Sequence, residues 1–434
     1  MREAVQTPDL KSALAAQLHA ARRRTLELLA PLSDEELVKQ HSPLMSPLAW
    51  DLAHTGHFEE LWLVRTIGGE RVSDGRFDRV YDAFEAPRAE RPNLDLLSPA
   101  EARAYVADVR SRVLEVLDEI ELDSEDPLLR DAFVYGLIVQ HEYQHQETIL
   151  ATLQLRDAPY PFDDEPPPTP SLPQEAEVFV EGGPFMIGTD DEPWAYDNER
   201  RAHEVHLPAF WIDSVPVTNA AYVEFVEAGG YADRRHWSDD GWAWRTEAGL
   251  EHPESWQRDG SGWTRLRFGR REPLPEAEPV QHVCWYEADA YARWSGRRLP
   301  TEAEWEKAAT WDPAGEKRRF PWGDEEPGGE HANLGQRRFG PAPAGSFPAG
   351  ASAWGCQQML GDVWEWTSSD FASYPGFEAF PYHEYSEVFF GPEYKVLRGG
   401  SWATHPVVAR PTFRNWDFPI RRQIFAGFRC ARDA

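Results

Sequence analysis

Residues 9–155 carry apolar side chains at the spacing of helices. Leu10, Leu14 and Leu18 recur every fourth residue and so fall on one helical face. Three further helices are predicted over residues 49–67, 98–122 and 126–155. Ser98 and Glu101 form a capping box at the start of the second of these, with proline at its first helical position. Four helices joined by short or moderate connections predict a helical bundle.

The pattern changes after residue 158. Residues 159–174 are rich in proline and contain an Asp-Asp-Glu cluster, so we expect a stiff, solvated linker. Beyond it apolar runs are short, glycine and proline are frequent, and all of the 19 tryptophans except Trp50 and Trp62 occur. Helices are predicted over 219–228, 285–295 and 301–310. The fold class is therefore α+β with two domains, a helical domain at 1–158 and an irregular α+β domain at 175–434.

Composition narrows the class of protein. A length of 434 residues suits two cores, and a net charge of −30 disfavours nucleic acid and anionic membranes as partners. No apolar run is long enough for a bilayer, and the first ten residues lack the apolar core of a secretory signal. Cys284, Cys356 and Cys430 lie far apart, which suits a reducing cytosol. We expect a cytoplasmic enzyme that acts as a monomer on small molecules.

A metal site is predicted in the helical domain. His141 and His145 lie four residues apart on one helix, so both imidazoles reach one point. The third ligand must come from another helix, where His54 is the main candidate and His57 competes with it. Glu147 points elsewhere on its helix and is a weaker candidate. Three neutral imidazoles leave open positions, which suits non-haem iron(II), although zinc is chemically allowed.

Two sets of motifs resemble known families. The pattern His141-x-x-x-His145-x-Glu147, together with His54, resembles the DinB-like metal-binding bundles. The second half resembles the formylglycine-generating, sulfatase-modifying family, which implies a C-type-lectin-like fold for residues 175–434. The motifs that carry this second resemblance are Gly182–Gly188, Pro216–Asn219, Arg298–Glu306, Gly361–Trp366, Arg398–Trp402 and Gly427–Cys430.

One departure changes the expected chemistry. Formylglycine-generating enzymes use a cysteine pair near the end of the chain, and no cysteine lies between Gly400 and Gly427 here. Both domains in one chain, with the segments 380–385 and 413–417, resemble the ergothioneine-biosynthetic iron(II) sulfoxide synthases. That resemblance implies joining the sulfur of γ-glutamylcysteine to the imidazole C2 of hercynine (Nα-trimethylhistidine) with dioxygen, giving a sulfoxide. Some relatives bind calcium, so calcium in the C-terminal domain is left open beside Fe²⁺.

The resemblance also implies residues for hercynine. Gln144 lies one helical turn from His141, where its amide can hold the substrate imidazole. Trp416 and Tyr385 are candidates for the trimethylammonium group, because aromatic faces attract cations. Asn415 is expected to form a hydrogen bond nearby.

The γ-glutamylcysteine residues and the proton donor follow from the same resemblance. Arg88 and Arg91 are expected to bind carboxylates, and Asp417 the ammonium group. The thiol and dioxygen can also react with each other to give a sulfinic acid as a competing product. For the carbon–sulfur bond to form first, a proton must be delivered rapidly to the oxygen species. Tyr382 is assigned this catalytic role because a phenol, with an unperturbed pKa of about 10, is protonated at neutral pH. The reverse assignment, with Tyr385 as donor, stays open.

Three alternatives remain at this stage. Cysteine could replace γ-glutamylcysteine as the thiol donor. A zinc-dependent thiol transferase or hydrolase on the DinB-like bundle would need neither iron nor oxygen, but would leave the second domain without a purpose. A binding module with a structural metal would need a coordinatively closed site, whereas only three ligands are evident.

Overall fold

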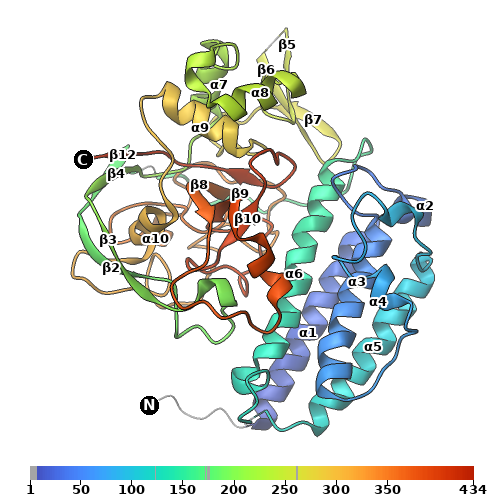
Figure 1. Cartoon of the computed structure of the whole chain (residues 1–434). Helices are drawn as coiled ribbons and strands as arrows, with labels where there is room; N and C mark the ends of the chain where they lie inside the picture. Colours follow the sequence, from blue (N-terminus) through green and yellow to red (C-terminus); the bar gives the residue numbers. More distant parts are fainter. Residues whose placement is uncertain (1–6, 123, 172, 174–175, 261) are drawn as a thin grey trace. The chain divides into compact units, whose positions relative to one another are not determined.

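A computed structural model describes residues 7–122, 124–171, 173, 176–260 and 262–434, without the side chains of residues 7–9. The chain divides into two compact units, Met1–Pro161 (unit 1) and Phe162–Ala434 (unit 2). The division falls inside the proline-rich segment expected at 159–174. Unit 1 is helical, and unit 2 combines short helices with four small sheets (Figure 1).

Unit 1 is built on four long helices that run side by side (Figure 1). They are α1 (Thr7–Leu29), α3 (Leu48–Glu59), α5 (Pro99–Glu119) and α6 (Phe133–Gln154). Helix α3 packs against α5 and α6, and α1 packs mainly against α6. The shorter elements are α2 (Asp34–Val38), α4 (Phe77–Val80), a π-helix (Glu60–Ile67), and 3-10 turns at Arg91–Asn93 and Arg130–Ala132. The predicted four-helix bundle is thus confirmed.

The helix limits differ from expectation at two places. Helix α6 begins at Phe133 and not near 126, because Asp131 and Ala132 have φ angles of 54° and 56°, which no α-helix accepts. The helix predicted over 49–67 exists, but its second half is a π-helix that continues α3 from Glu60. The capping box of α5 is present as predicted, with the Ser98 and Glu101 side chains each accepting from the other's backbone.

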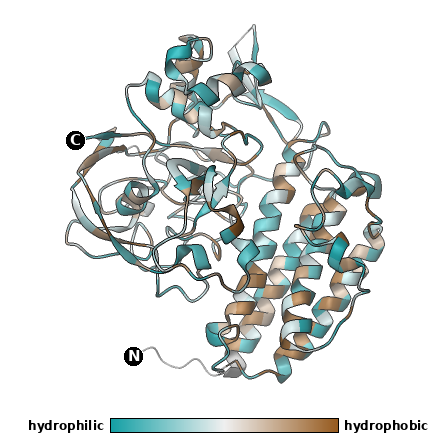
Figure 2. Cartoon of the chain, in the orientation of Figure 1, coloured by the Kyte–Doolittle hydropathy of each residue, from teal (hydrophilic) through white to brown (hydrophobic). Residues whose placement is uncertain are grey.

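The bundle core combines apolar packing with buried charge. Apolar and polar colours alternate around its helices in Figure 2, and the apolar positions form the core. A Cβ on Gly56 would lie 2.6 Å from Val106, so this glycine lets α3 approach α5 closely. Arg22 and Arg110 both pair with Glu59, at 2.8 and 2.6 Å, and both also reach Glu142 on α6. This buried quartet ties all four long helices together.

The described residues of unit 2 form four sheets and four short helices. Its strands are β1 (Glu177–Val180), β2 (Gly183–Ile187), β3 (His203–Leu207), β4 (Phe210–Asp213), β5 (Trp256–Asp259), β6 (Gly262–Arg267), β7 (Arg270–Pro273), β8 (Trp364–Phe371), β9 (Gly391–Arg398), β10 (Asn415–Asp417), β11 (Ala426–Gly427) and β12 (Ala431–Asp433). The sheets have the orders β1-β4-β12, β10-β9-β8-β11, β2-β3 and β5-β6-β7. All pairs are antiparallel except β8 with β11. The α+β class is confirmed.

The helices of unit 2 match the sequence pattern in part. Helices α7 (Asn219–Glu227), α9 (Trp285–Trp294) and α10 (Glu302–Thr310) occur where they were predicted. Helix α8 (Asp239–Ala248) was not predicted, because Trp242 and Trp244 lie two residues apart and give no clear apolar helical face. The remaining described turns are 3-10 turns at Asp197–Glu199, Arg234–His236, Pro348–Gly350, His383–Tyr385 and Glu387–Phe389.

Buried arginine–carboxylate pairs hold unit 2 together. Arg414 donates to both oxygens of Glu302 at 2.9 Å, and Arg398 pairs with Glu306. Similar buried pairs join Arg410 to Glu199, Arg422 to Glu287 and Arg429 to Glu365. Most of these residues belong to the conspicuous sequence motifs, so the motifs contribute largely to internal ion pairs that stabilise the fold.

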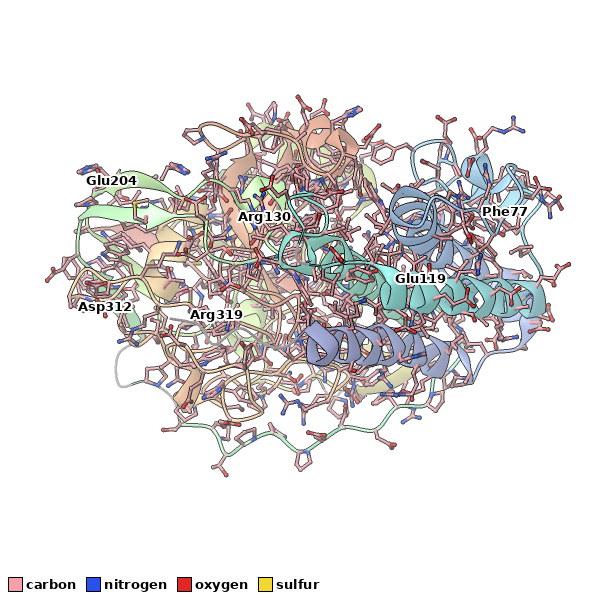
Figure 3. All side chains as sticks on the ribbon, turned by 90° about the horizontal axis from the view of Figure 1, so that it is seen from below. Phe77, Glu119, Arg130, Glu204, Asp312 and Arg319 are labelled. Atoms are coloured by element: carbon pink, nitrogen blue, oxygen red, sulfur yellow. The ribbon has the colours of Figure 1, made fainter. Side chains whose placement is uncertain are left out.

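The segment after α10 lies on the same side of unit 2 as β3, as the labels of Asp312 and Glu204 show (Figure 3).

The proline-rich segment forms hydrogen bonds and an ion pair with the rest of unit 2. Its side chains are mostly exposed, as expected for a linker. However, Asp164 pairs with Arg267 at 2.7 Å and accepts from the Phe339 amide at 2.9 Å. The Ser171 amide donates to the Gly345 carbonyl at 2.7 Å. These contacts hold the stretch in place while most of its side chains stay exposed, and its role as a stiff linker stays a prediction.

Candidate metal centre

Three histidines converge inside the bundle of unit 1. His54 comes from the middle of α3, and His141 and His145 come from α6. One nitrogen from each lies within 4.8 Å of the other two, and the ring centroids are 4.6 to 5.1 Å apart. The helical spacing of His141 and His145 thus brings two imidazoles to the point that His54 reaches from the facing helix. This group has the donor set and the compactness to hold a metal ion.

The loop before α5 orients His54. Its Nδ1 lies 2.6 Å from the carbonyl oxygen of Tyr81, which can only accept a hydrogen bond. This contact therefore places the proton on Nδ1 and leaves Nε2 as a lone-pair donor. The ring also stacks on Trp50, with centroids 4.6 Å apart and planes 12° from parallel. Both contacts fix the ring of His54 before any ligand arrives.

Burial keeps two of the three imidazoles neutral. His141 stacks on Phe58 with ring centroids 3.9 Å apart. Removal from water, and next the neighbouring His145, lowers the pKa of both His54 and His141 well below the ordinary value. Both rings are therefore neutral at pH 7, which is the form that binds metals.

A buried carboxylate faces the third histidine. Asp51, on α3, is 1% exposed, and its Oδ1 lies 3.3 Å from Nδ1 of His145. Neither Asp51 oxygen nor His145 Nδ1 has a hydrogen-bond partner among the described residues. Buried polar atoms are normally paired, so this contact needs an explanation.

The competing ligands lie elsewhere. His57 is buried one turn after His54, but its Nε2 lies 3.7 Å from Asp78 Oδ1, beside Arg65. It does not belong to the group that includes His54. Glu147 is half-buried on α6 and is likewise outside that group. The choice of His54 over His57 thus agrees with the geometry.

The structure separates the two arginines expected to bind γ-glutamylcysteine. Arg88 is exposed. Arg91 is 5% exposed, and its guanidinium donates to the carbonyl of Ala86 at 2.8 Å and to Ser46 Oγ at 2.5 Å. Its Cζ also lies 3.5 Å from the centroid of Trp50, the ring that supports His54. Substrate binding by both arginines stays a prediction, but Arg91 already has a structural task behind the metal centre.

Gln144 lies on α6 between His141 and His145 and is half-buried. Its position along the helix is the one expected from the sequence. Its contact with a substrate imidazole stays a prediction.

In unit 2 the structure gathers three of the predicted aromatic residues. Tyr385 lies edge-on to Trp416, with centroids 5.8 Å apart, and edge-on to Tyr382 at 6.2 Å. One face of Tyr385 stacks on Tyr196 at 4.2 Å, and one face of Trp416 stacks on Phe371 at 4.2 Å. Tyr385 ends the 3-10 turn at His383–Tyr385, Tyr382 directly precedes that turn, and Trp416 lies on β10. The cluster therefore joins segments far apart in sequence.

Asn415 and Asp417 flank Trp416 on β10. Alternation along a strand puts their side chains on the face opposite to that of Trp416. Asn415 Oδ1 accepts from the Trp416 amide at 2.9 Å, and Asp417 pairs with Arg421 at 3.3 Å. A substrate ammonium at Asp417 would therefore share this carboxylate with Arg421.

Asp51, Tyr81 and Phe58 belong to the centre but were not identified from the sequence. Asp51 precedes His54 by three residues, and this helical spacing of an acid and a histidine was an available signal. Tyr81 acts through its carbonyl, and a backbone contact leaves no trace in the side-chain pattern.

Several other features bear on function. Within the described residues, the three histidines are the only group of three or more His, Cys, Asp or Glu side chains close enough to share a metal ion. Calcium in unit 2 stays a prediction. All three cysteines are buried and free. No helix in the described part of the chain is long and apolar enough to cross a bilayer.

Comparison with known proteins agrees with both halves of this architecture. Residues 17–149 match the DinB superfamily, and residues 163–434 match the sulfatase-modifying factor enzyme 1-like domain. The formylglycine-generating enzyme of Streptomyces coelicolor is 35% identical over 292 residues, which cover 59% of this chain and 89% of that protein. These matches confirm the two resemblances drawn from the motifs.

The full-length matches are more specific. The hercynine oxygenase of Mycolicibacterium thermoresistibile is 53% identical over 436 residues, covering 98% of this chain and 95% of that protein. The hercynine oxygenase of Mycobacterium tuberculosis is 52% identical over 429 residues, covering 97% and 98%. Both units are included in these alignments, as the combined resemblance predicted. The chain therefore belongs to the hercynine oxygenase family, whose members are sulfoxide synthases of ergothioneine biosynthesis.

Proposed function

We propose that this protein uses iron(II) and dioxygen to join the sulfur of γ-glutamylcysteine to the imidazole C2 of hercynine, giving the sulfoxide. The observation that carries the proposal is the group of three converging imidazoles in a chain that aligns with hercynine oxygenases over nearly its whole length. We also propose a cytoplasmic location, which the free cysteines favour.

The residues present fit a divalent transition metal. His54, His141 and His145 would hold it, and no carboxylate belongs to the group. Asp51, buried and without a hydrogen-bond partner among the described residues, places a carboxylate behind one ligand, and a bound cation would balance its charge. Iron(II), once bound, would supply the activation of dioxygen that the reaction requires.

The side chains have separate tasks in this proposal. Gln144 holds the imidazole of hercynine beside the ligands of its own helix. Tyr385 and Trp416 contact the trimethylammonium group with their rings, and Asn415 hydrogen-bonds to the same substrate. Tyr382 holds the proton that directs the reaction to carbon–sulfur bond formation and away from the sulfinic acid. The edge-on contact of Tyr382 with Tyr385 supports a common location for the last two tasks.

The thiol donor is proposed to be γ-glutamylcysteine. Its carboxylates would bind at Arg88 and Arg91, and its ammonium group at Asp417. Arg88, being exposed, is available for such a contact, whereas Arg91 would have to share its guanidinium with Ser46 and Ala86.

The test is reconstitution of the metal-free protein with iron(II) under anaerobic conditions, followed by addition of oxygenated buffer. Oxygen uptake and product mass are measured with hercynine plus γ-glutamylcysteine, and with hercynine plus cysteine. We expect the sulfoxide with γ-glutamylcysteine and a much slower reaction with cysteine. Activity with zinc and no oxygen uptake would instead favour a thiol transferase. Cysteine as the better substrate would overturn the thiol assignment.

A further inference from the structure

The most unusual buried group of unit 1 is the carboxylate of Asp51. It is 1% exposed, and both of its oxygens lack a hydrogen-bond partner among the residues that the structure describes. A buried, unpaired carboxylate is strongly unfavourable, so something must compensate for its charge. The buried acids Glu59 and Glu142 show the usual solution, because each pairs with two arginines.

The surroundings of Asp51 offer one arginine and one imidazole. Burial lowers the pKa of Arg91 to about 10, and the charge of Asp51 opposes this shift. However, the hydrogen bonds of Arg91 go to Ser46 Oγ and to the carbonyls of Ala86 and Ala83, and not to Asp51. The imidazole is that of His145, whose Nδ1 lies 3.3 Å from Asp51 Oδ1. That nitrogen also lacks a hydrogen-bond partner among the described residues.

We propose that Asp51 is a positioning residue, which accepts a hydrogen bond from Nδ1 of His145 and thereby directs Nε2 of that ring to the metal. The inference rests on the proposed metal centre. A charged N–H···O⁻ hydrogen bond is ordinarily about 2.7 to 2.9 Å long, so the proposed bond requires the 3.3 Å contact to shorten by a few tenths of an ångström. The bond selects the tautomer, and the carboxylate increases the basicity of the ligand.

The three ligand imidazoles differ in the protein group that each of them contacts. His54 donates to a neutral carbonyl, that of Tyr81. His145 faces an anion, and His141 stacks on the apolar ring of Phe58. Asp51 is therefore a carboxylate within ion-pair distance of a ligand imidazole, and a divalent cation on the three rings would balance its charge.

The experiment measures metal binding and uses no substrate. Affinity for iron(II) is determined anaerobically by competition with a chromogenic chelator in the unmodified protein, in Asp51→Asn and in Asp78→Asn. Asp78 is the matched control, because it stands 3.7 Å from His57, which is outside the ligand group. Asp51→Asn should weaken iron(II) binding about 10- to 100-fold, and Asp78→Asn should stay within about twofold.

A second readout separates positioning from ordinary structural support. The asparagine side chain has nearly the shape of aspartate without its charge, so the metal-free Asp51→Asn protein should unfold at no lower temperature than the unmodified one. A structural acid would show the opposite, with a lower unfolding temperature and unchanged metal affinity. An iron(II) affinity within twofold of the unmodified protein would overturn the proposal.

A third measurement needs no variant, in case Asp51→Asn does not fold. In the unmodified protein loaded with zinc as a diamagnetic probe, nitrogen-15 spectra should show His145 protonated on Nδ1 and bound to the metal through Nε2. Metal bound to Nδ1 of His145 would overturn the proposal. If the unmodified protein bound metal in this way but formed no sulfoxide, the proposed function would fail while the role of Asp51 stood.

Discussion

In unit 1 the candidate ligands lie in the middle of two long helices, whereas in unit 2 the candidate substrate residues lie on a three-residue strand and a short 3-10 turn. The histidines are positioned by helical repeat and by local contacts with Trp50, Phe58 and the Tyr81 carbonyl. The aromatic cluster of unit 2 instead depends on ties between segments far apart in sequence. Arg414, directly before Asn415, is held by Glu302 more than a hundred residues away.

The turn that carries Tyr382 and Tyr385 shows the same dependence. Asp197 accepts from the Phe380 amide at 3.2 Å and from Ser386 Oγ at 2.5 Å, so one carboxylate holds both ends of the turn. Burial raises the pKa of Asp197 to about 6, in spite of these hydrogen bonds. Regular secondary structure therefore positions the metal ligands, and a network of buried ion pairs and hydrogen bonds positions the candidate substrate residues of unit 2. The predictions that follow test this division, beginning with the largest effect.

Loss of a ligand should abolish the chemistry without unfolding the bundle. His141→Ala removes one of three imidazoles, so we expect loss of iron binding and a fall in sulfoxide formation of about 10³-fold or more. Metal content and product mass are the measurements. His57→Ala is the control, since His57 faces Asp78, and it should keep its iron. Full iron content in His141→Ala would show that the metal is bound elsewhere.

Removing one buried ion pair of unit 2 should destabilise that unit. Arg414 is buried and bonds to both oxygens of Glu302, so Arg414→Met leaves this buried acid with only the more distant Arg398, at 3.7 Å, as a cationic partner. We expect the free energy of unfolding to fall by about 3 kcal/mol. Denaturant unfolding followed by tryptophan fluorescence measures it. Arg432→Met breaks the partly exposed pair with Glu177 and should cost less than about 1 kcal/mol. Equal losses of unfolding free energy in the two variants would contradict the proposed role of the buried ion pairs.

Tyr382→Phe tests the proton donor while leaving the ring in place. Iron binding should be unchanged, sulfoxide formation should slow by about 10²–10⁴-fold, and the sulfinic acid of the thiol should accumulate. Mass spectrometry of the products gives the ratio directly. Tyr385→Phe is the matched variant, and a larger shift toward sulfinic acid in that variant would exchange the two assignments.

The smallest effect is expected at the exposed arginine. Arg88→Ala should raise the Michaelis constant for γ-glutamylcysteine about tenfold or more, as the loss of one charged hydrogen bond would, and leave that for hercynine nearly unchanged. Steady-state kinetics with each substrate varied in turn measures it. Arg91→Ala should in addition lower stability, because Arg91 holds the loop and covers Trp50. An unchanged constant in Arg88→Ala would remove Arg88 from the substrate site.

The same division explains how far the sequence could be interpreted. Leu14, Ser98 and the His141–His145 spacing indicated the bundle and two of its candidate ligands, because helical contacts lie three or four residues apart. The contact of Asp197 with Ser386, or of Arg414 with Glu302, has no such period and follows only from the tertiary fold. The start of α6 was missed for a similar reason, since the left-handed backbone at Asp131 and Ala132 has no glycine to mark it. The motifs of unit 2 could be assigned only by their resemblance to a family.

The central claim is that His54, His141 and His145 hold the iron that the reaction needs. X-ray absorption of the iron(II)-loaded protein tests it most directly, because imidazole rings give a characteristic multiple-scattering signal. The account predicts three imidazoles per iron in the unmodified protein, two or fewer iron-bound imidazoles in any fraction that still holds iron after His54→Ala, and three in His57→Ala. Three imidazoles in His54→Ala, or a carboxylate-dominated site in the unmodified protein, would contradict it.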